Sequence, residues 1–165
     1  MNCPCCYDPH KGNILTKEFI STSPQETLDF GTSIGKALEG GEIILLSGDL
    51  GSGKTLLTRG IATGLDIDPT NTVVSPSFTL MNIYKARIDI IHVDLYRLDS
   101  DDVYELGIED FMDREHVIIV EWAGRSKDLF QGDIIGISIE YLDDFSRKIF
   151  LRTNIVLPDE TTMAS

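Results

Sequence analysis

The stretch Gly48-Asp49-Leu50-Gly51-Ser52-Gly53-Lys54-Thr55 decides the fold of this protein. It matches G-x-x-x-x-G-K-[ST], the pattern of a phosphate-binding loop, at every fixed position. The apolar run Ile43-Ile44-Leu45-Leu46 precedes it and predicts a strand buried on both faces. Residues 55–65 predict a helix directly after it. This strand–loop–helix context is what the motif requires, so we interpret the stretch as a nucleotide site and not as a Gly-rich loop without function.

The residue types of the loop suit ATP and Mg²⁺. Glycines let the backbone wrap closely, so that several N–H groups from Gly48 to Gly53 point inward at the phosphates. The following helix adds the positive end of its dipole. We expect Lys54 to reach the β- and γ-phosphates and the Thr55 hydroxyl to ligate Mg²⁺.

Two acidic residues are candidates for the remaining magnesium contacts. Asp94 follows Ile90-Ile91-His92-Val93, and Glu121 follows Val117-Ile118-Ile119-Val120. An acid directly after a mostly apolar strand lies at the carboxyl edge of an α/β sheet, where ligands bind. His92 is interpreted either as a packed histidine or as a catalytic base, and Trp122 either as a neighbour of the nucleotide or as a packing residue.

A hydroxyl-rich segment, Ser75-Pro76-Ser77-Phe78-Thr79, lies between the helix after the loop and the strand that ends at Asp94. A segment that senses the γ-phosphate is expected at this position, although Ser-Pro is also an ordinary turn signal. We take Ser77 as its candidate catalytic residue, beside Lys54, Asp94 and Glu121.

The rest of the chain predicts an α/β fold: a P-loop NTPase-like mixed sheet flanked by helices, with an antiparallel C-terminal hairpin. Ser23-Pro24-Gln25-Glu26 is a helix start, with a capping residue, a proline at the first position and a glutamate in place for a capping box. Strands are predicted at 13–21, 42–47, 78–84, 87–94, 117–120, 133–141 and 147–153, and further helices at 55–65 and from 100. We expect one domain over residues 14–157, with flexible ends at 1–13 and 158–165.

Charge and composition exclude several classes of protein. The net charge is −13, with 27 acidic against 14 basic residues and no Lys/Arg cluster, which argues against a direct, tight tRNA or DNA binder. No apolar run approaches the ~18 residues of a membrane span, and the N-terminus does not resemble a signal peptide, so a cytoplasmic location is expected. Cys3, Cys5 and Cys6 lack the paired spacing of a zinc site; they are interpreted as part of an incidental tail, with a metal or redox role as the alternative.

Four ordered motifs together resemble one family. They are the loop Gly48–Thr55, Ser-Pro-Ser-Phe-Thr-Leu, His-Val-Asp-Leu-Tyr-Arg-Leu and Val-Glu-Trp. This combination, from about residue 21 to 151, resembles the TsaE (YjeE) family, the ATPase subunit of the bacterial system that makes N6-threonylcarbamoyladenosine at position 37 of tRNA. The resemblance implies action on the TsaD and TsaB subunits, with tRNA reached only through them.

The resemblance also implies roles for single residues. Leu50–Thr55 would hold the nucleotide, Glu121 would be the acidic magnesium residue and Asp94 its companion. Arg147 resembles an arginine that contacts the nucleotide, Pro24 falls near a position beside it, and Ser77 stands where the family usually has Thr.

Three other functions share a phosphate loop. A small-molecule kinase usually brings an Arg-rich lid, which this chain lacks, and a regulatory GTPase needs the guanine-reading Asn/Thr-Lys-x-Asp motif, which is missing. A nucleotide-gated binding module that hardly hydrolyses ATP overlaps with the leading interpretation, because an ATPase that depends on partners looks nearly inert alone.

Overall fold

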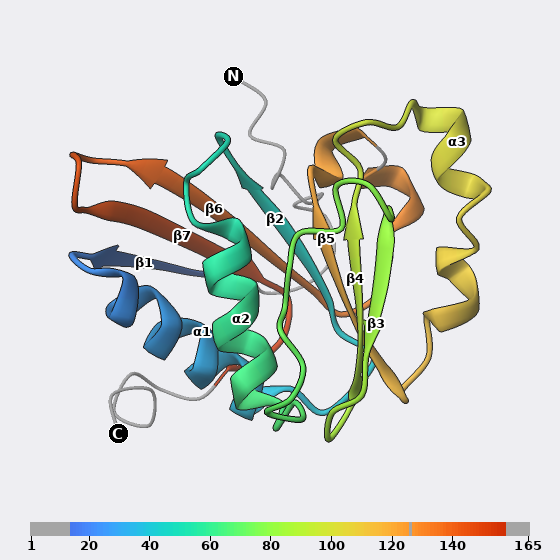
Figure 1. Ribbon diagram of the computed structural model, residues 1–165, viewed down its shortest axis with the longest axis horizontal. Coiled ribbons are helices and arrows are strands. Elements are labelled where there is room, and N and C mark those ends of the chain that lie inside the picture. Colours follow the sequence, from blue (N-terminus) through green and yellow to red (C-terminus); the bar gives the residue numbers. More distant parts are fainter. Residues whose placement is uncertain (1–13, 126, 158–165) are drawn as a thin grey trace.

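The computed structural model describes residues 14–125 and 127–157, and these residues form one seven-stranded sheet (Figure 1). The strand order is β1-β7-β6-β2-β5-β4-β3. The strands are β1 (Leu15–Ser21), β2 (Ile43–Gly48), β3 (Met81–Tyr84), β4 (Asp89–Asp94), β5 (His116–Glu121), β6 (Ile134–Tyr141) and β7 (Arg147–Thr153). Strands β6, β2, β5 and β4 run parallel, whereas β3 pairs antiparallel with β4, and β7 with both β6 and β1. The predicted α/β class, with its mixed sheet and antiparallel C-terminal hairpin, is confirmed.

Both faces of the sheet are covered. Helices α1 (Pro24–Ala37) and α2 (Lys54–Gly64) lie on one face (Figure 1). The short helix α3 (Ser100–Tyr104) and three 3₁₀ turns, Ile108–Phe111, Ala123–Arg125 and Lys127–Leu129, cover the other. Successive strand residues alternate between the two cores: Ile44 packs toward α1 and α2, and Ile43 toward α3. The apolar run in β2 is therefore a strand buried on both faces, as predicted.

Helix α1 begins as the sequence predicts and is then held tightly to α2. Ser23 caps the helix by accepting a hydrogen bond from Glu26 N at 3.2 Å. The Glu26 carboxylate accepts from the N–H of Thr22, at 2.7 Å, so the return bond of the capping box falls one residue early. Glycines at 31 and 35 of α1 meet glycines at 60 and 64 of α2, and the helix backbones touch there.

Strands β3 and β4 begin three and two residues later than predicted, and local contacts explain both differences. Strand β3 starts at Met81 because the three residues before it form a turn, in which Leu80 N donates to Pro76 O at 2.7 Å and Leu80 has φ 67°. Strand β4 starts at Asp89 because Arg87 turns aside to cap α1, donating to the carbonyls of Gly35 and Leu38. The predicted flexible ends, with the three cysteines, lie outside the described residues.

The topology gathers the candidate residues at one edge of the sheet. Strands β2, β5, β4 and β6 all end at this edge, because they are parallel. The antiparallel strands β7 and β3 begin there, and the segment 75–80 enters there as well. Within the described ranges, no helix combines the length and the apolarity that crossing a bilayer requires.

Candidate nucleotide and magnesium site

The phosphate loop connects the end of β2 to the start of α2. Gly53, the residue before the helix, has φ +114°, which favours glycine, and a Cβ built on it would meet nothing within 4 Å. A Cβ on Gly48 would instead lie 2.6 Å from Ser52 Oγ, because the loop folds back over its own start. No side chain of the described residues caps the first turn of α2. Its backbone N–H groups are therefore available to an anion in the loop.

Lys54 is the cationic centre of the loop. The residue is 5% exposed, and its Nζ donates to the carbonyls of Gly48 at 2.7 Å and Asp49 at 3.0 Å. Burial lowers the pKa of Lys54 below its ordinary value, and the negative charges of Glu121, Asp94 and Asp49 oppose that shift. Phosphate oxygens are stronger acceptors than the two carbonyls, so a bound nucleotide would take over this ammonium.

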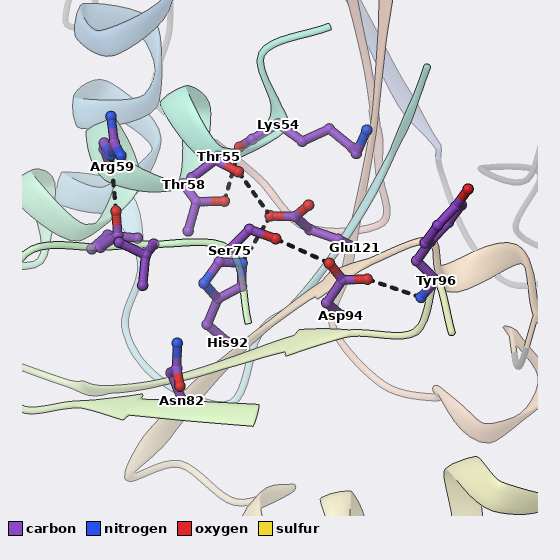
Figure 2. A network of polar contacts seen from close by, with 12 residues as sticks. Lys54, Thr55, Thr58, Arg59, Ser75, Asn82, His92, Asp94, Tyr96 and Glu121 are labelled. Atoms are coloured by element: carbon purple, nitrogen blue, oxygen red, sulfur yellow. Dashed lines mark hydrogen bonds and ion pairs between the residues drawn. The ribbon is translucent and has the colours of Figure 1, made fainter. Parts of the chain in front are cut away.

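The two predicted metal acids lie side by side. Glu121 pairs in register with Leu46 of β2 on one side and with Asp94 of β4 on the other. Both residues are nearly buried, Glu121 at 3% and Asp94 at 4% exposure. The Thr55 hydroxyl donates to Glu121 Oε1 at 3.4 Å, which joins the first turn of α2 to the acid on β5 (Figure 2). The structure thus brings Thr55, Asp94 and Glu121 together.

The segment 75–80 reaches Asp94 through Ser75. Its Oγ donates to Asp94 Oδ2 at 3.0 Å, while Tyr96 N donates to Oδ1 at 2.8 Å (Figure 2). Ser77, the residue singled out from the sequence, is half-buried two positions later, inside the turn closed by Leu80. The hydroxyl that contacts the acid therefore comes from Ser75, the first residue of the segment, and not from Ser77.

The hairpin of β6 and β7 braces the loop from outside. Arg147 Nε donates to Ser52 O at 3.2 Å, and the Tyr141 hydroxyl donates to Leu50 O at 3.2 Å. The Arg147 guanidinium lies 4.2 Å from the centre of the Tyr141 ring. Pro24 opens α1 at the same edge of the sheet, three residues after Ser21, the β1 partner of Arg147.

Comparison with known proteins decides the family. The family model described as "Threonylcarbamoyl adenosine biosynthesis protein TsaE" matches residues 21–149. The chain belongs to the TsaE family. Proteins named tRNA threonylcarbamoyladenosine biosynthesis protein TsaE are similar to it: one from Treponema pallidum is 35% identical (79% of this chain, 96% of that one), and one from Aquifex aeolicus is 38% identical (82% and 95%). The crystal structure of Bacillus subtilis YdiB matches with a TM-score of 0.73 at 26% identity, covering 88% of this chain and 90% of that one.

The donor set of this TsaE family member fits Mg²⁺ held together with a nucleotide. The described residues contain no group of three or more His, Cys, Asp or Glu side chains that could hold a metal alone. Magnesium in nucleotide sites does not need such a cage, because it takes one or two carboxylates and completes its octahedron with phosphate oxygens and water. Thr55, Glu121 and Asp94 supply hard oxygen donors of this kind.

Sequence reasoning missed three contacts of the TsaE site. The bond of Tyr141 to the loop and that of Ser75 to Asp94 have no local signature, although Ser75 belongs to the hydroxyl-rich segment. The third is a 2.9 Å contact between His92 Nε2 and Glu121 Oε1. The alternation of His92 with apolar neighbours was the signal that it shares a face with Asp94.

Proposed function

We propose that this TsaE family member is the ATP-binding and ATP-hydrolysing subunit required for threonylcarbamoyl modification of adenosine 37 in tRNA. The family supports the pathway, through the printed descriptions of the model and the relatives. One observation carries the ATPase proposal. Glu121 pairs in register with Asp94 beside a complete phosphate loop, and the Thr55 hydroxyl at the end of that loop donates to Glu121.

In the proposed mechanism each residue of the site has one task. Lys54 and the N–H groups of the loop neutralise and orient the β- and γ-phosphates. Thr55 and Glu121 hold the metal, with Asp94 as companion, and the bound Mg²⁺ would offset charge that develops on the transferred phosphoryl group. Arg147 fixes the loop through Ser52 O, 3.2 Å away, and contacts the nucleotide.

The segment 75–79 would report the γ-phosphate to a partner. Ser75 ties this segment to Asp94, so a change at the metal acid is passed to it. Ser77 would orient the attacking water. The partners are the TsaB and TsaD subunits, which the proposed pathway places in the cytoplasm with tRNA. We propose that hydrolysis is weak in the isolated protein and is stimulated by these partners.

The competing function is phosphoryl transfer to a small molecule. A kinase would need several arginines that clamp the transferred phosphoryl group. Arg147 does reach the phosphate loop, but there its guanidinium donates to the backbone carbonyl of Ser52. The test is phosphate release from ATP by the protein alone, and then with TsaB, TsaD and tRNA added. Release that rises with the partners supports the proposal. ATP consumption that needs a small-molecule acceptor, or none under any of these conditions, overturns it.

Nucleotide choice provides a second check. The guanine-reading motif is missing from the sequence, so ATP should bind more tightly than GTP. Calorimetry with each nucleotide and Mg²⁺ measures the difference, and a clear preference for GTP would favour the regulatory GTPase.

A further inference from the structure

His92 is a buried histidine that faces the nucleotide site. Side chains along β4 alternate between the two faces of the sheet, so His92 and Asp94 lie on the α2 side, whereas Ile91 and Val93 pack into the opposite core. Glu121 of β5 is on the α2 side as well. The imidazole is 0% exposed, and Figure 2 shows it beside the Glu121 carboxylate.

The contacts of the two ring nitrogens indicate that His92 has a polar role and is not kept for packing alone. Nε2 lies 2.9 Å from Glu121 Oε1, and Nδ1 is buried without a hydrogen-bond partner among the described residues. A residue kept only for packing would be better apolar, because a buried nitrogen without a partner destabilises the folded state. The contact with Glu121 is therefore what distinguishes this histidine from the isoleucines and valines around it.

The geometry at Glu121 indicates what that contact does. Thr55 Oγ1 and His92 Nε2 both approach Oε1, one from α2 and one from β4. A carboxylate accepts hydrogen bonds and donates none, so the ring must carry its proton on Nε2. With Oε1 held from two sides, the rotation of the carboxyl group is fixed and Oε2 is left to face a cation.

We propose that His92 is a positioning residue that orients the Glu121 carboxylate toward Mg²⁺, an inference that rests on the proposed nucleotide–magnesium site. It does not touch the nucleotide. Its contribution is confined to the part of ATP binding that depends on the metal, which makes it measurable without any assay of hydrolysis.

The experiment compares ATP affinity, by calorimetry, in Mg²⁺ and in EDTA. His92→Leu removes the N–H donor, and His92→Gln keeps an N–H donor near the position of Nε2. Ile90→Val is the matched control, because Ile90 lies two residues earlier on the same face and loses only apolar contact. We expect His92→Leu to reduce the Mg²⁺-dependent gain in ATP affinity about tenfold, with the affinity in EDTA unchanged, and His92→Gln to restore most of the gain.

A second measurement needs no change at His92. Long-range ¹⁵N–¹H spectra of the protein, with His10 and His116 replaced by Gln for assignment, should show His92 protonated at Nε2 and bare at Nδ1. Protonation at Nδ1 with a bare Nε2 overturns the inference, and so does a His92→Leu variant that keeps the full gain from Mg²⁺. Equal losses in Mg²⁺ and EDTA for both His92 variants would show a merely structural role and also overturn it. If the unsubstituted protein gains no ATP affinity from Mg²⁺, the proposed function itself fails, a result distinct from the others.

Discussion

The ammonium of Lys54 lies 4.6 Å from the centre of the Trp122 ring. Trp122 follows Glu121 at the end of β5 and has φ 61°, a left-handed conformation that is rare for a bulky residue. The backbone N–H of Trp122 donates to Leu46 O at 3.2 Å, which anchors the turn after β5 to β2. The indole thus lies against the cation of the phosphate loop and also packs against the core on the α3 side, so the structure bears on both interpretations of Trp122.

Replacing Lys54 by Ala should remove most of the affinity for ATP and leave the fold intact. The ammonium contacts two loop carbonyls and one ring, and all three lie at the ligand site. Charge-assisted bonds to phosphate each contribute about 1.5–3 kcal/mol, so we expect a loss of at least about tenfold. Calorimetry of ATP binding measures it, with circular dichroism as the check on folding. Unchanged affinity in a folded variant would contradict the assignment of the loop.

Lys54 should also lower the stability of the nucleotide-free protein at neutral pH. Burial lowers its pKa below the ordinary 10.5, so the unfolded chain binds this proton more tightly than the folded one. At pH values below the pKa that Lys54 has in the folded protein, its buried charge destabilises the folded state. This destabilisation disappears as the pH rises from that pKa to about 10.5, the pKa in the unfolded chain. Lys54→Met should therefore melt at a higher temperature than the unsubstituted protein at pH 7, and the difference should shrink toward pH 10.5.

Thermal scans of both proteins over this pH range, without nucleotide, test the sign. Comparing the two proteins cancels the titration of all other groups. A methionine variant that melts lower at pH 7 would show that the carboxylates of Glu121 and Asp94 outweigh burial at Lys54.

Glu121→Ala and Asp94→Ala should each impair hydrolysis more than nucleotide binding. The two carboxylates adjoin in register at the loop, where charge develops on the phosphoryl group during transfer. Loss of metal charge stabilisation removes several kcal/mol, so we expect turnover with partners present to fall by about 100-fold or more. Glu105→Ala, at an exposed acid directly after the last residue of α3, is the control. Normal turnover in both site variants would refute the magnesium roles.

Much of this site was predictable because its parts are local in sequence. The phosphate loop, the acids at the ends of β4 and β5 and the cap of α1 each depend on residues within a few positions. The central strands were predictable because they are also local features: burial on both faces of the sheet requires a continuous apolar run in the sequence.

The unpredicted parts join residues that are far apart in the chain. Ser75 and Asp94 are 19 residues apart, His92 and Glu121 are 29 apart, and Leu50 and Tyr141 are 91 apart. Such contacts depend on strand order and register, which single-sequence patterns do not specify. The late start of β3 has a similar origin: the turn that ends at the left-handed Leu80 includes Phe78 and Thr79, although both are residue types that favour a strand.

Gly35→Ala should destabilise the whole domain. A Cβ at this position would lie 2.1 Å from Ile61 O of α2, and both atoms belong to helices that cannot shift independently. Overpacking of this kind typically costs about 1–3 kcal/mol, and backbone contact favours the upper end. Lys36→Ala, one residue later and exposed, is the control. Chemical denaturation of both variants measures the difference, and equal stability would mean that the helices are not held at this contact.

The isolated protein should not bind tRNA tightly at physiological salt. The net charge of −13 repels a polyanion, and no run of Lys or Arg offsets that repulsion. A gel shift with tRNA over a range of salt concentrations measures the affinity. Submicromolar binding by the chain alone would contradict the expectation that tRNA is reached through partner subunits.

Binding to the TsaB–TsaD pair should instead be direct and sensitive to both salt and nucleotide. An acidic surface steers association with a basic face of a partner, and that attraction weakens as ions screen it. ATP should strengthen the contact relative to ADP, because Ser75 links the 75–79 segment to Asp94 beside the phosphate loop. Pull-downs of the pair with ATP, ADP or no nucleotide, at low and high salt, test both effects. Ser75→Ala should reduce the difference between ATP and ADP while leaving the salt dependence unchanged, since it removes the link and no charge. Binding that is absent in every nucleotide state would overturn the partner assignment, and binding that ignores the nucleotide would confine the 75–79 segment to a local role.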